Sequence, residues 1–155
     1  MRDDERSRAE VVLGLAVVGV VMVVLGGLLA AVTGPLELAK GSWAAAYLVL
    51  VAGVTQVAMG VALRRWGGRV GAAWWQFVLW NLGNAAVILG TLLASPALVF
   101  VGSAALVAAL ALAFLATLRG ARTQDRMLLI GYRLLLVLVV VSIPVGMVLF
   151  VIRQA

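Results

Sequence analysis

Apolar residues in this chain form long runs that are separated by short polar connectors. A helix needs about 20 apolar residues to cross the hydrocarbon core of a bilayer, and five runs reach that length. The five runs cover residues 11–32, 44–63, 72–94, 97–118 and 127–152. We therefore predict an all-α integral membrane protein. It would be a five-transmembrane-helix bundle forming a single membrane domain over residues 1–155, with no soluble domain.

Details within the runs indicate how the helices pack. The first run exceeds the core of a signal peptide, which has about 7–15 apolar residues, so we expect an uncleaved first span. Small residues at three-and-four spacing let helix backbones approach closely in lipid. The glycines expected at such contacts are Gly19, Gly26, Gly53, Gly60, Gly83 and Gly90. Pro144 lies inside the last run and is expected to kink it, because it removes a hydrogen bond to the carbonyl of Val140.

The composition agrees with a membrane environment. Of the 155 residues, 65% are hydrophobic and 12% are charged, whereas about 25% of a soluble domain is charged. The net charge of +6 would suggest nucleic-acid binding in a soluble protein, but here the arginines lie in short connectors that form no groove. We expect these arginines to meet anionic lipid headgroups at the cytoplasmic rim, and we expect no nucleic-acid partner.

The distribution of lysine and arginine predicts the orientation. If the N-terminus is cytoplasmic, nine of these residues lie on the inner side and two, Lys40 and Arg153, lie on the outer side. Trp66, Trp74 and Trp75 would then lie at the inner membrane interface. The positive-inside rule thus predicts a cytoplasmic N-terminus and an extracytoplasmic C-terminus. The expected location is a cell membrane, crossed several times, and specifically a prokaryotic plasma membrane.

Polar residues in the third run are the first candidates for a site. Asn81, Asn84 and Thr91 fall on one helix face, within an arc of roughly 80°. At about 1.5 Å per residue, Asn81 and Gln56 of the preceding run both lie roughly 12 Å from the cytoplasmic edge. We therefore predict a contact between Gln56 and Asn81 or Asn84. These amides can form interhelical hydrogen bonds of about 0.6–2 kcal/mol, line a pocket for a ligand or permeant, or contact a partner subunit.

Arg133 is the formal charge within a predicted span, and two interpretations are open. It can lie at the interface, with its long side chain reaching the headgroups. It can instead point inward, where the amides of Gln56 and Asn81 or the carbonyl freed at Pro144 are available. An arginine buried in this way would be a candidate functional residue.

The residue types that are missing exclude several chemistries. The chain has no cysteine and no histidine, which removes thiolate chemistry, haem ligation by histidine and most zinc or copper sites. The predicted spans contain no aspartate or glutamate for a proton or sodium relay. The WNLGN stretch at residues 80–84, followed by Ser95-Pro96, resembles helices of haem–copper oxidase large subunits, yet no histidine could bind their cofactors. We expect no enzyme activity, no catalytic residue, no cofactor and no metal.

Two functions fit these observations. The first is a non-enzymatic polytopic membrane protein that forms a homo-oligomer or an accessory subunit of a larger membrane complex, because packing surface is abundant and chemistry is scarce. The second is a small channel, carrier or lipophile-binding protein. Its polar pocket would contain Gln56, Asn81, Asn84 and Arg133.

Overall fold

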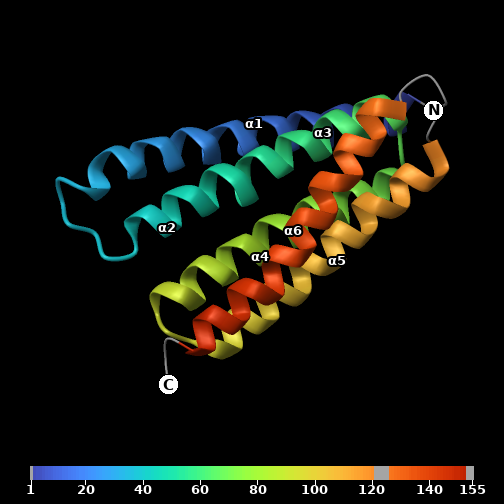
Figure 1. Cartoon of the computed structure of the whole chain (residues 1–155). Coiled ribbons are helices and arrows are strands. Elements are labelled where there is room, and N and C mark those ends of the chain that lie inside the picture. The colour runs from blue at the N-terminus through green and yellow to red at the C-terminus, as the bar shows by residue number, and fades with distance from the viewer. Residues whose placement is uncertain (1, 121–125, 153–155) are drawn as a thin grey trace. The chain divides into compact units, whose positions relative to one another are not determined.

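The computed structural model describes residues 2–120 and 126–152, and within these ranges every regular element is helical (Figure 1). The chain divides into two compact units, Met1–Arg65 and Trp66–Ala155. The elements are α1 (Arg2–Thr33), α2 (Gly41–Ala46), the π-helix η1 (Tyr47–Val54), α3 (Thr55–Trp66), α4 (Val70–Leu92), α5 (Pro96–Gly120) and α6 (Arg126–Ile152). The first four lie in the first unit, apart from Trp66, and the last three in the second.

Four helical segments of the described chain are long and apolar enough to cross a membrane. They are Asp3–Thr33, Gly41–Trp66, Pro96–Leu118 and Arg126–Val148. These segments support the prediction of an all-helical, membrane-embedded protein. The third apolar run also forms a helix, the 23-residue α4. Its amides Gln76, Asn81 and Asn84 lower its hydropathy, and it is not among the four. The fifth span therefore stays a prediction.

In the first unit, α1 runs antiparallel to a continuous helical segment made of α2, η1 and α3 (Figure 1). The helix α1 begins at Arg2, well before the first apolar run at Val11, because the charged head of the chain is also helical. Asp3, Asp4 and Glu5 occupy its first turn. Their carboxylates are favourable at the positive end of the helix dipole.

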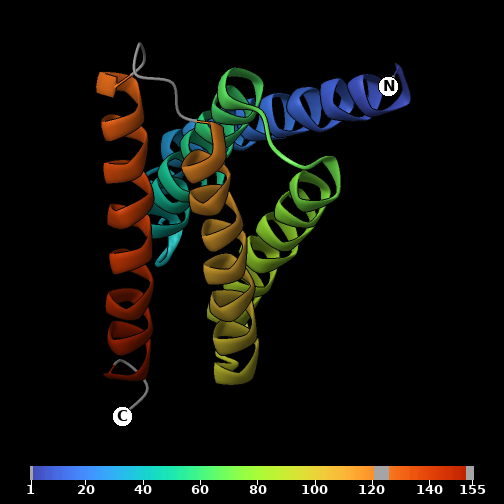
Figure 2. The same ribbon diagram turned by 90° about the vertical axis from the view of Figure 1, so that its right-hand side faces the viewer.

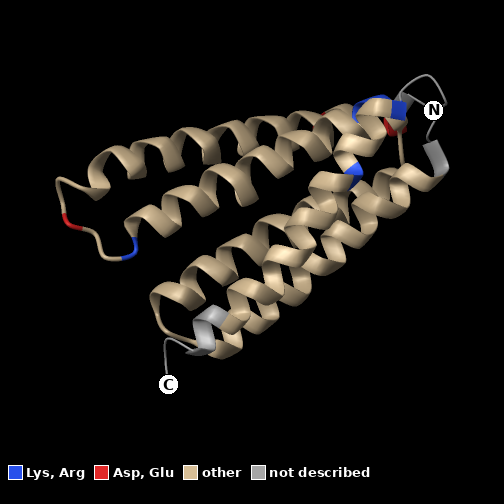
Figure 3. Ribbon diagram, in the orientation of Figure 1, with Lys and Arg blue, Asp and Glu red and all other residues tan. Residues whose placement is uncertain are grey.

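Charged side chains of the first unit lie toward the ends of this hairpin (Figure 3). Glu37 and Lys40 belong to the connector between α1 and α2, whereas Arg64 and Arg65 lie in the last turn of α3. The helical segment from Gly41 to the residue before Arg64 carries no charged side chain. This arrangement suits a segment surrounded by hydrocarbon, where an ionised side chain is costly.

A π-helix in the middle of the second apolar run is a feature that the sequence did not predict. In η1 the backbone bonds join residues five apart, which widens the helix. The hydroxyl of Thr55 accordingly donates to the carbonyl of Leu50, five residues earlier, at 3.0 Å. The wider turn thus satisfies a buried hydroxyl within its own helical segment.

Glycines set the close approach of the two sides of the first hairpin. A Cβ added at Gly19 would lie 3.0 Å from the carbonyl oxygen of Gly53, and one added at Gly26 would lie 2.9 Å from that of Ala45. A Cβ at Gly60 would lie 3.2 Å from a side-chain atom of α1. Larger residues at these positions would push the helices apart, as expected where small residues mediate helix packing in lipid.

In the second unit, α4 and α5 form a hairpin with a tight turn. The N–H of Ser95 donates to the carbonyl of Gly90 at 2.8 Å, and Ala94 between them has a φ of +53°. This is the hydrogen-bond pattern of a Schellman motif, in which glycine is the usual residue at the left-handed position. Pro96 then begins α5, which suits a residue that has no N–H to donate.

Glycines hold α4 and α5 together near this turn but not elsewhere. A Cβ added at Gly102 would lie 2.8 Å from both the carbonyl oxygen of Gly83 and the amide nitrogen of Val87. One added at Gly90 would lie 2.8 Å from a backbone nitrogen of α5. Toward the start of α4 the two helices diverge (Figure 2). There, a Cβ added at Gly71 would have no atom within 4 Å.

The last helix, α6, runs beside α5 and buries one narrow stripe (Figures 1 and 2). Tyr132, Leu136 and Val139 are buried at helical spacing, whereas Leu138 is 67% exposed. Pro144 lies inside α6, which is one continuous helix from Arg126 to Ile152. The kink predicted at this proline stays a prediction.

Candidate functional site

Asn81, Asn84 and Thr91 of α4 each donate a hydrogen bond to their own helix. The amide nitrogen Nδ2 of Asn81 donates to the carbonyl of Phe77 at 2.8 Å, and that of Asn84 donates to the carbonyl of Trp80 at 2.7 Å. The hydroxyl of Thr91 donates in the same way to the carbonyl four residues earlier, at 2.8 Å. Such bonds satisfy side-chain donors without a neighbouring helix.

Asn84 nevertheless keeps one unsatisfied atom. Its side chain is 5% exposed, and its Oδ1 has no hydrogen-bond partner in the described part of the chain. An unsatisfied buried acceptor costs about 1–3 kcal/mol. Gln56 is also buried, at 1% exposure, but it belongs to the first unit. Asn81 and Asn84 belong to the second unit, so the contact of Gln56 with either of them remains a prediction.

Arg133 contacts the end of α5. Its Nε donates to the hydroxyl oxygen of Thr117 at 3.3 Å, and its guanidinium carbon lies 5.5 Å from the centroid of the Phe114 ring. The Thr117 hydroxyl in turn donates to the carbonyl of Phe114 at 2.7 Å. Within residues 2–120 and 126–152 the guanidinium thus contacts Thr117 and Phe114, and it does not bond to the amides of α4 there.

The depth of these partners supports the interfacial interpretation of Arg133. At about 1.5 Å per residue, Arg133 lies roughly 10 Å from the start of α6, whereas Thr117 lies roughly 5 Å from the end of α5. Since α5 ends where α6 begins, the side chain of Arg133 extends toward the ends of both helices. This is the geometry by which long basic side chains reach the membrane surface.

An aromatic contact joins the start of α6 to Trp66, the last residue of α3 and the first of the second unit. The rings of Trp66 and Tyr132 have centroids 5.6 Å apart and are tilted by 49°. Both side chains are buried, with exposures of 9% and 7%. The indole Nε1 of Trp66 is also buried and has no hydrogen-bond partner in the described chain. Trp66 is thus buried, whereas Trp75, expected beside it at the interface, is 65% exposed.

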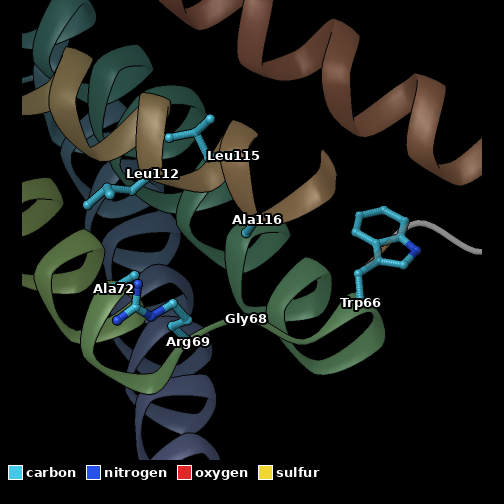
Figure 4. A pocket seen from close by; sticks show the side chains of 7 residues that line it. All are labelled: Trp66, Gly68, Arg69, Ala72, Leu112, Leu115 and Ala116. Carbon is cyan, nitrogen blue, oxygen red and sulfur yellow. The ribbon is translucent and has the colours of Figure 1, made fainter. Parts of the chain in front are cut away.

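A cavity of about 300 Å³ occupies the place where α4 and α5 diverge (Figure 4). We call it the rim cavity, and its lining residues are Trp66, Gly68, Arg69, Ala72, Leu112, Leu115 and Ala116. Arg69 lies along the start of α4 beside Ala72, whereas the Trp66 ring stands on the other side of Ala116 (Figure 4). The cavity therefore has a cation at one side, an indole at the other, and an apolar wall from α5.

Sequence reasoning did not select the residues of the rim cavity. The cavity depends on the register between α4 and α5. This register places glycine contacts in one half of the hairpin and none at Gly71 in the other half. A signal was present in the connector, where Trp66 and Arg69 flank two glycines. The sequence alone places Trp66 at the membrane interface and Arg69 among the arginines that meet lipid headgroups, without joining them in one cavity.

The described residues offer no metal centre. No group of three or more His, Cys, Asp and Glu side chains that could hold a metal ion occurs within residues 2–120 and 126–152. The polar side chains described above are amides, hydroxyls, an indole and arginines. They can bind and orient a partner through hydrogen bonds.

These features define the class of the protein: an all-helical protein with four helices long and apolar enough to cross a membrane in its described part. Comparison with models of known protein families, with curated proteins and with solved structures finds no match to this chain.

Proposed function

We propose that this chain is a non-enzymatic, five-span membrane protein that acts as a homo-oligomer or as an accessory subunit of a larger membrane complex. Its N-terminus lies in the cytoplasm and its C-terminus outside, in a prokaryotic plasma membrane. The observation that carries this proposal is a set of glycines on long apolar helices at which an added Cβ would have no atom of the described chain within 4 Å.

The helical glycines differ in what surrounds them. At several positions in the two hairpins an added Cβ would meet the opposite helix, as at Gly26 and Gly102. At Gly27 in α1 and at Gly131 and Gly146 in α6, an added Cβ would meet no atom within 4 Å. A glycine inside a helix costs about 0.5–1 kcal/mol relative to alanine. Close approach of a helix from another chain would give these glycines a structural role.

The low burial of α1 and α6 supports the same proposal. In the most apolar stretch of α1 and of α6, 22% of the residues are buried. The corresponding shares are 44% in the segment containing α2 and α3 and 39% in α5. Lipid alone can cover such surfaces. The coincidence of low burial with uncovered glycines on the same two helices favours a protein partner.

The alternative of a channel or carrier has less support. The amide donors of Asn81 and Asn84 bond to their own backbone, and Arg133 bonds at the end of α5. The unsatisfied Oδ1 of Asn84 is the observation in its favour. One buried acceptor fits a helix contact as well as a permeant.

Leucine at the uncovered glycines should disrupt association. We expect the wild type, extracted in mild detergent from native membranes, to elute as a defined oligomer or with a stoichiometric partner. Gly27→Leu and Gly146→Leu should each lower the associated fraction, because leucine would hold the partner helix away. Both variants should keep the thermal stability of the wild-type monomer, since the added side chain meets open space within the chain.

Alanine at the same positions is the matched control, because a methyl group still permits close helix packing. Gly27→Ala and Gly146→Ala should associate as the wild type does. A wild type that is a monodisperse monomer without a partner would contradict the proposal. So would full association of both leucine variants.

Cysteine labelling should establish the topology. The chain has no cysteine, so single substitutions give a clean background for an impermeant maleimide applied to whole cells or spheroplasts. We expect Ser42→Cys and Ser95→Cys to react from outside and Ser7→Cys to react only after the membrane is opened. Reaction of Ser42→Cys with protection of Ser95→Cys would show that α4 does not cross the membrane.

A further inference from the structure

Arg133 stands where α5 ends and α6 begins, and its contacts leave the end of its guanidinium unused. From this geometry we propose that Arg133 binds the phosphate group of a phospholipid, whichever headgroup that phosphate carries. The terminal nitrogens Nη1 and Nη2 would donate to two phosphate oxygens, and the acyl chains would continue over the apolar surfaces of the two helices. The inference rests on α5 and α6 being long and apolar enough to cross a membrane, and not on the oligomeric state proposed above.

Two contacts hold the guanidinium in place. Its Nε donates to the Thr117 hydroxyl at 3.3 Å, and its carbon Cζ lies over the Phe114 ring, 5.5 Å from the centroid. The Thr117 hydroxyl is itself oriented, because it donates to the carbonyl of Phe114 at 2.7 Å. A long side chain that is already ordered loses less conformational entropy when a ligand binds to it. These contacts therefore prepare Arg133 for a ligand.

The end of the guanidinium has no partner in the described chain. Nη1 and Nη2 make no hydrogen bond within residues 2–120 and 126–152. They are also not among the side-chain atoms that are buried there without a partner, so they are accessible from outside the chain. The planar fork that they form is suited to two oxygens of a phosphate or of a carboxylate.

The depth of Arg133 favours phosphate over carboxylate. At about 1.5 Å per residue, Arg133 lies roughly 10 Å from the start of α6. An ionised group without an acceptor is costly at such a depth. The five apolar runs contain no Asp or Glu, so neither this chain nor a second copy has a carboxylate within a predicted span. Phospholipids carry phosphate at the membrane surface, which a long basic side chain can reach from this depth.

The surroundings of Arg133 favour a lipid over inorganic phosphate. About one turn before it and one turn after it on α6, Ile130 and Val137 are exposed, and Leu118 is exposed next to Thr117 on α5. A free phosphate ion would lose much of its hydration beside these apolar side chains. A phospholipid carries its phosphate and its acyl chains in one molecule. It can therefore bind the guanidinium and cover the apolar side chains together.

Native mass spectrometry of the purified full-length protein in mild detergent tests this site. The protein would be titrated with phosphatidylcholine, phosphatidylglycerol and diacylglycerol of the same acyl chains. Arg133→Gln should weaken binding of the first phosphatidylcholine about ten-fold, the loss expected when one hydrogen bond to a charged group is removed. Phosphatidylglycerol should lose affinity by the same factor, because both lipids carry the phosphate. Diacylglycerol lacks it and should bind to the wild type and to Arg133→Gln equally.

Two further variants separate the fork of Arg133 from its charge. Arg126 is an exposed arginine at the start of α6, about two turns before Arg133. Arg126→Gln removes the same charge and should leave phosphatidylcholine binding unchanged. Arg133→Lys keeps the charge but loses the planar fork. Its affinity for phosphatidylcholine should lie between those of the wild type and Arg133→Gln.

Four results would overturn the proposal. Wild-type phosphatidylcholine affinity in Arg133→Gln would leave a carboxylate of another membrane protein as the acceptor. A loss confined to phosphatidylglycerol, or a loss as large in Arg126→Gln, would indicate general electrostatic attraction. An equal loss of diacylglycerol binding in Arg133→Gln would show that the substitution disturbs the apolar surface. Displacement of the lipid by millimolar inorganic phosphate would show that a soluble anion is the ligand instead.

Discussion

Gly102→Leu should destabilise the second unit by about 3 kcal/mol or more, the upper range for overpacking of a closely packed interior. A Cβ at this position already lies 2.8 Å from the carbonyl oxygen of Gly83 and from the amide nitrogen of Val87. Both are backbone atoms, so no side-chain rotation can make room and α4 must move away from α5. In detergent, the midpoint of thermal unfolding should fall by roughly 6–12 °C.

Two variants separate this packing effect from a general effect of leucine. Gly71→Leu places the same side chain in α4 where an added Cβ meets no atom within 4 Å. Its unfolding midpoint should stay within about 2 °C of the wild type. Gly102→Ala should give an intermediate loss, because its methyl group clashes while alanine favours the helix by about 1 kcal/mol. An unchanged midpoint for Gly102→Leu would show that α4 and α5 do not approach at these glycines.

Much of the helical architecture could be predicted from the apolar runs. The run at residues 72–94 corresponds to α4 at Val70–Leu92, and the run at 127–152 corresponds to α6 at Arg126–Ile152. In a bilayer every backbone polar group must be satisfied internally, so a long apolar run has few options besides a helix. The start of α1 was less predictable. Its charged head continues the helix beyond the apolar run that defined the expected span.

The π-helix shows where local sequence stops being informative. Residues 47–54 are as apolar as the rest of their run, and nothing in them marks a change of helix type. The wider turn becomes visible through the bond of Thr55 to Leu50 and through the tight contact of Gly53 with Gly19. Both depend on how α1 packs against this segment, which hydrophobic periodicity does not specify.

The sequence predicted which polar residues are candidates for a site, but it did not predict which residues they contact. Asn81, Asn84 and Arg133 were identified because polar residues are rare within apolar runs. Their partners depend on which helix faces meet. The sequence left open whether Arg133 reaches an interface or a buried amide, and its contacts with Thr117 and Phe114 favour the interface. A periodic apolar helix such as α6, apolar on nearly all sides, gives no clue to the face that meets α5.

The rim cavity depends on how α4 and α5 pack against each other, which the sequence does not specify. It exists because glycine contacts close α4 on α5 at one end, while Gly71 at the other end makes none. Its lining comes from two stretches that are distant in the sequence, residues 66–72 and residues 112–116. Arg69 and Trp66 come to line one cavity only because Leu112, Leu115 and Ala116 of α5 pack beside them. A search for sequence motifs would not find such a site, because its residues follow no fixed spacing in the sequence.

Trp66→Ala should cost about 3–5 kcal/mol, the range for truncating a buried aromatic residue. Trp66 is 9% exposed, and its ring packs against Tyr132, one of the few buried side chains of α6. Because α6 buries only a narrow stripe, the loss of this contact should also increase hydrogen exchange over the first turns of α6. Thermal unfolding and hydrogen exchange in detergent measure the two effects.

The chain contains matched controls for this prediction. Trp75→Ala removes the same volume from a side chain that is 65% exposed, and it should change stability by no more than about 0.5 kcal/mol. Trp66→Phe keeps the ring against Tyr132 and removes an N–H without a partner in the described chain, so the protein should lose little stability. Equal losses for Trp66→Ala and Trp75→Ala would contradict the burial of Trp66. A loss for Trp66→Phe as large as that for Trp66→Ala would instead assign the stabilisation to the indole N–H, because the two variants differ by the aromatic ring that packs on α6.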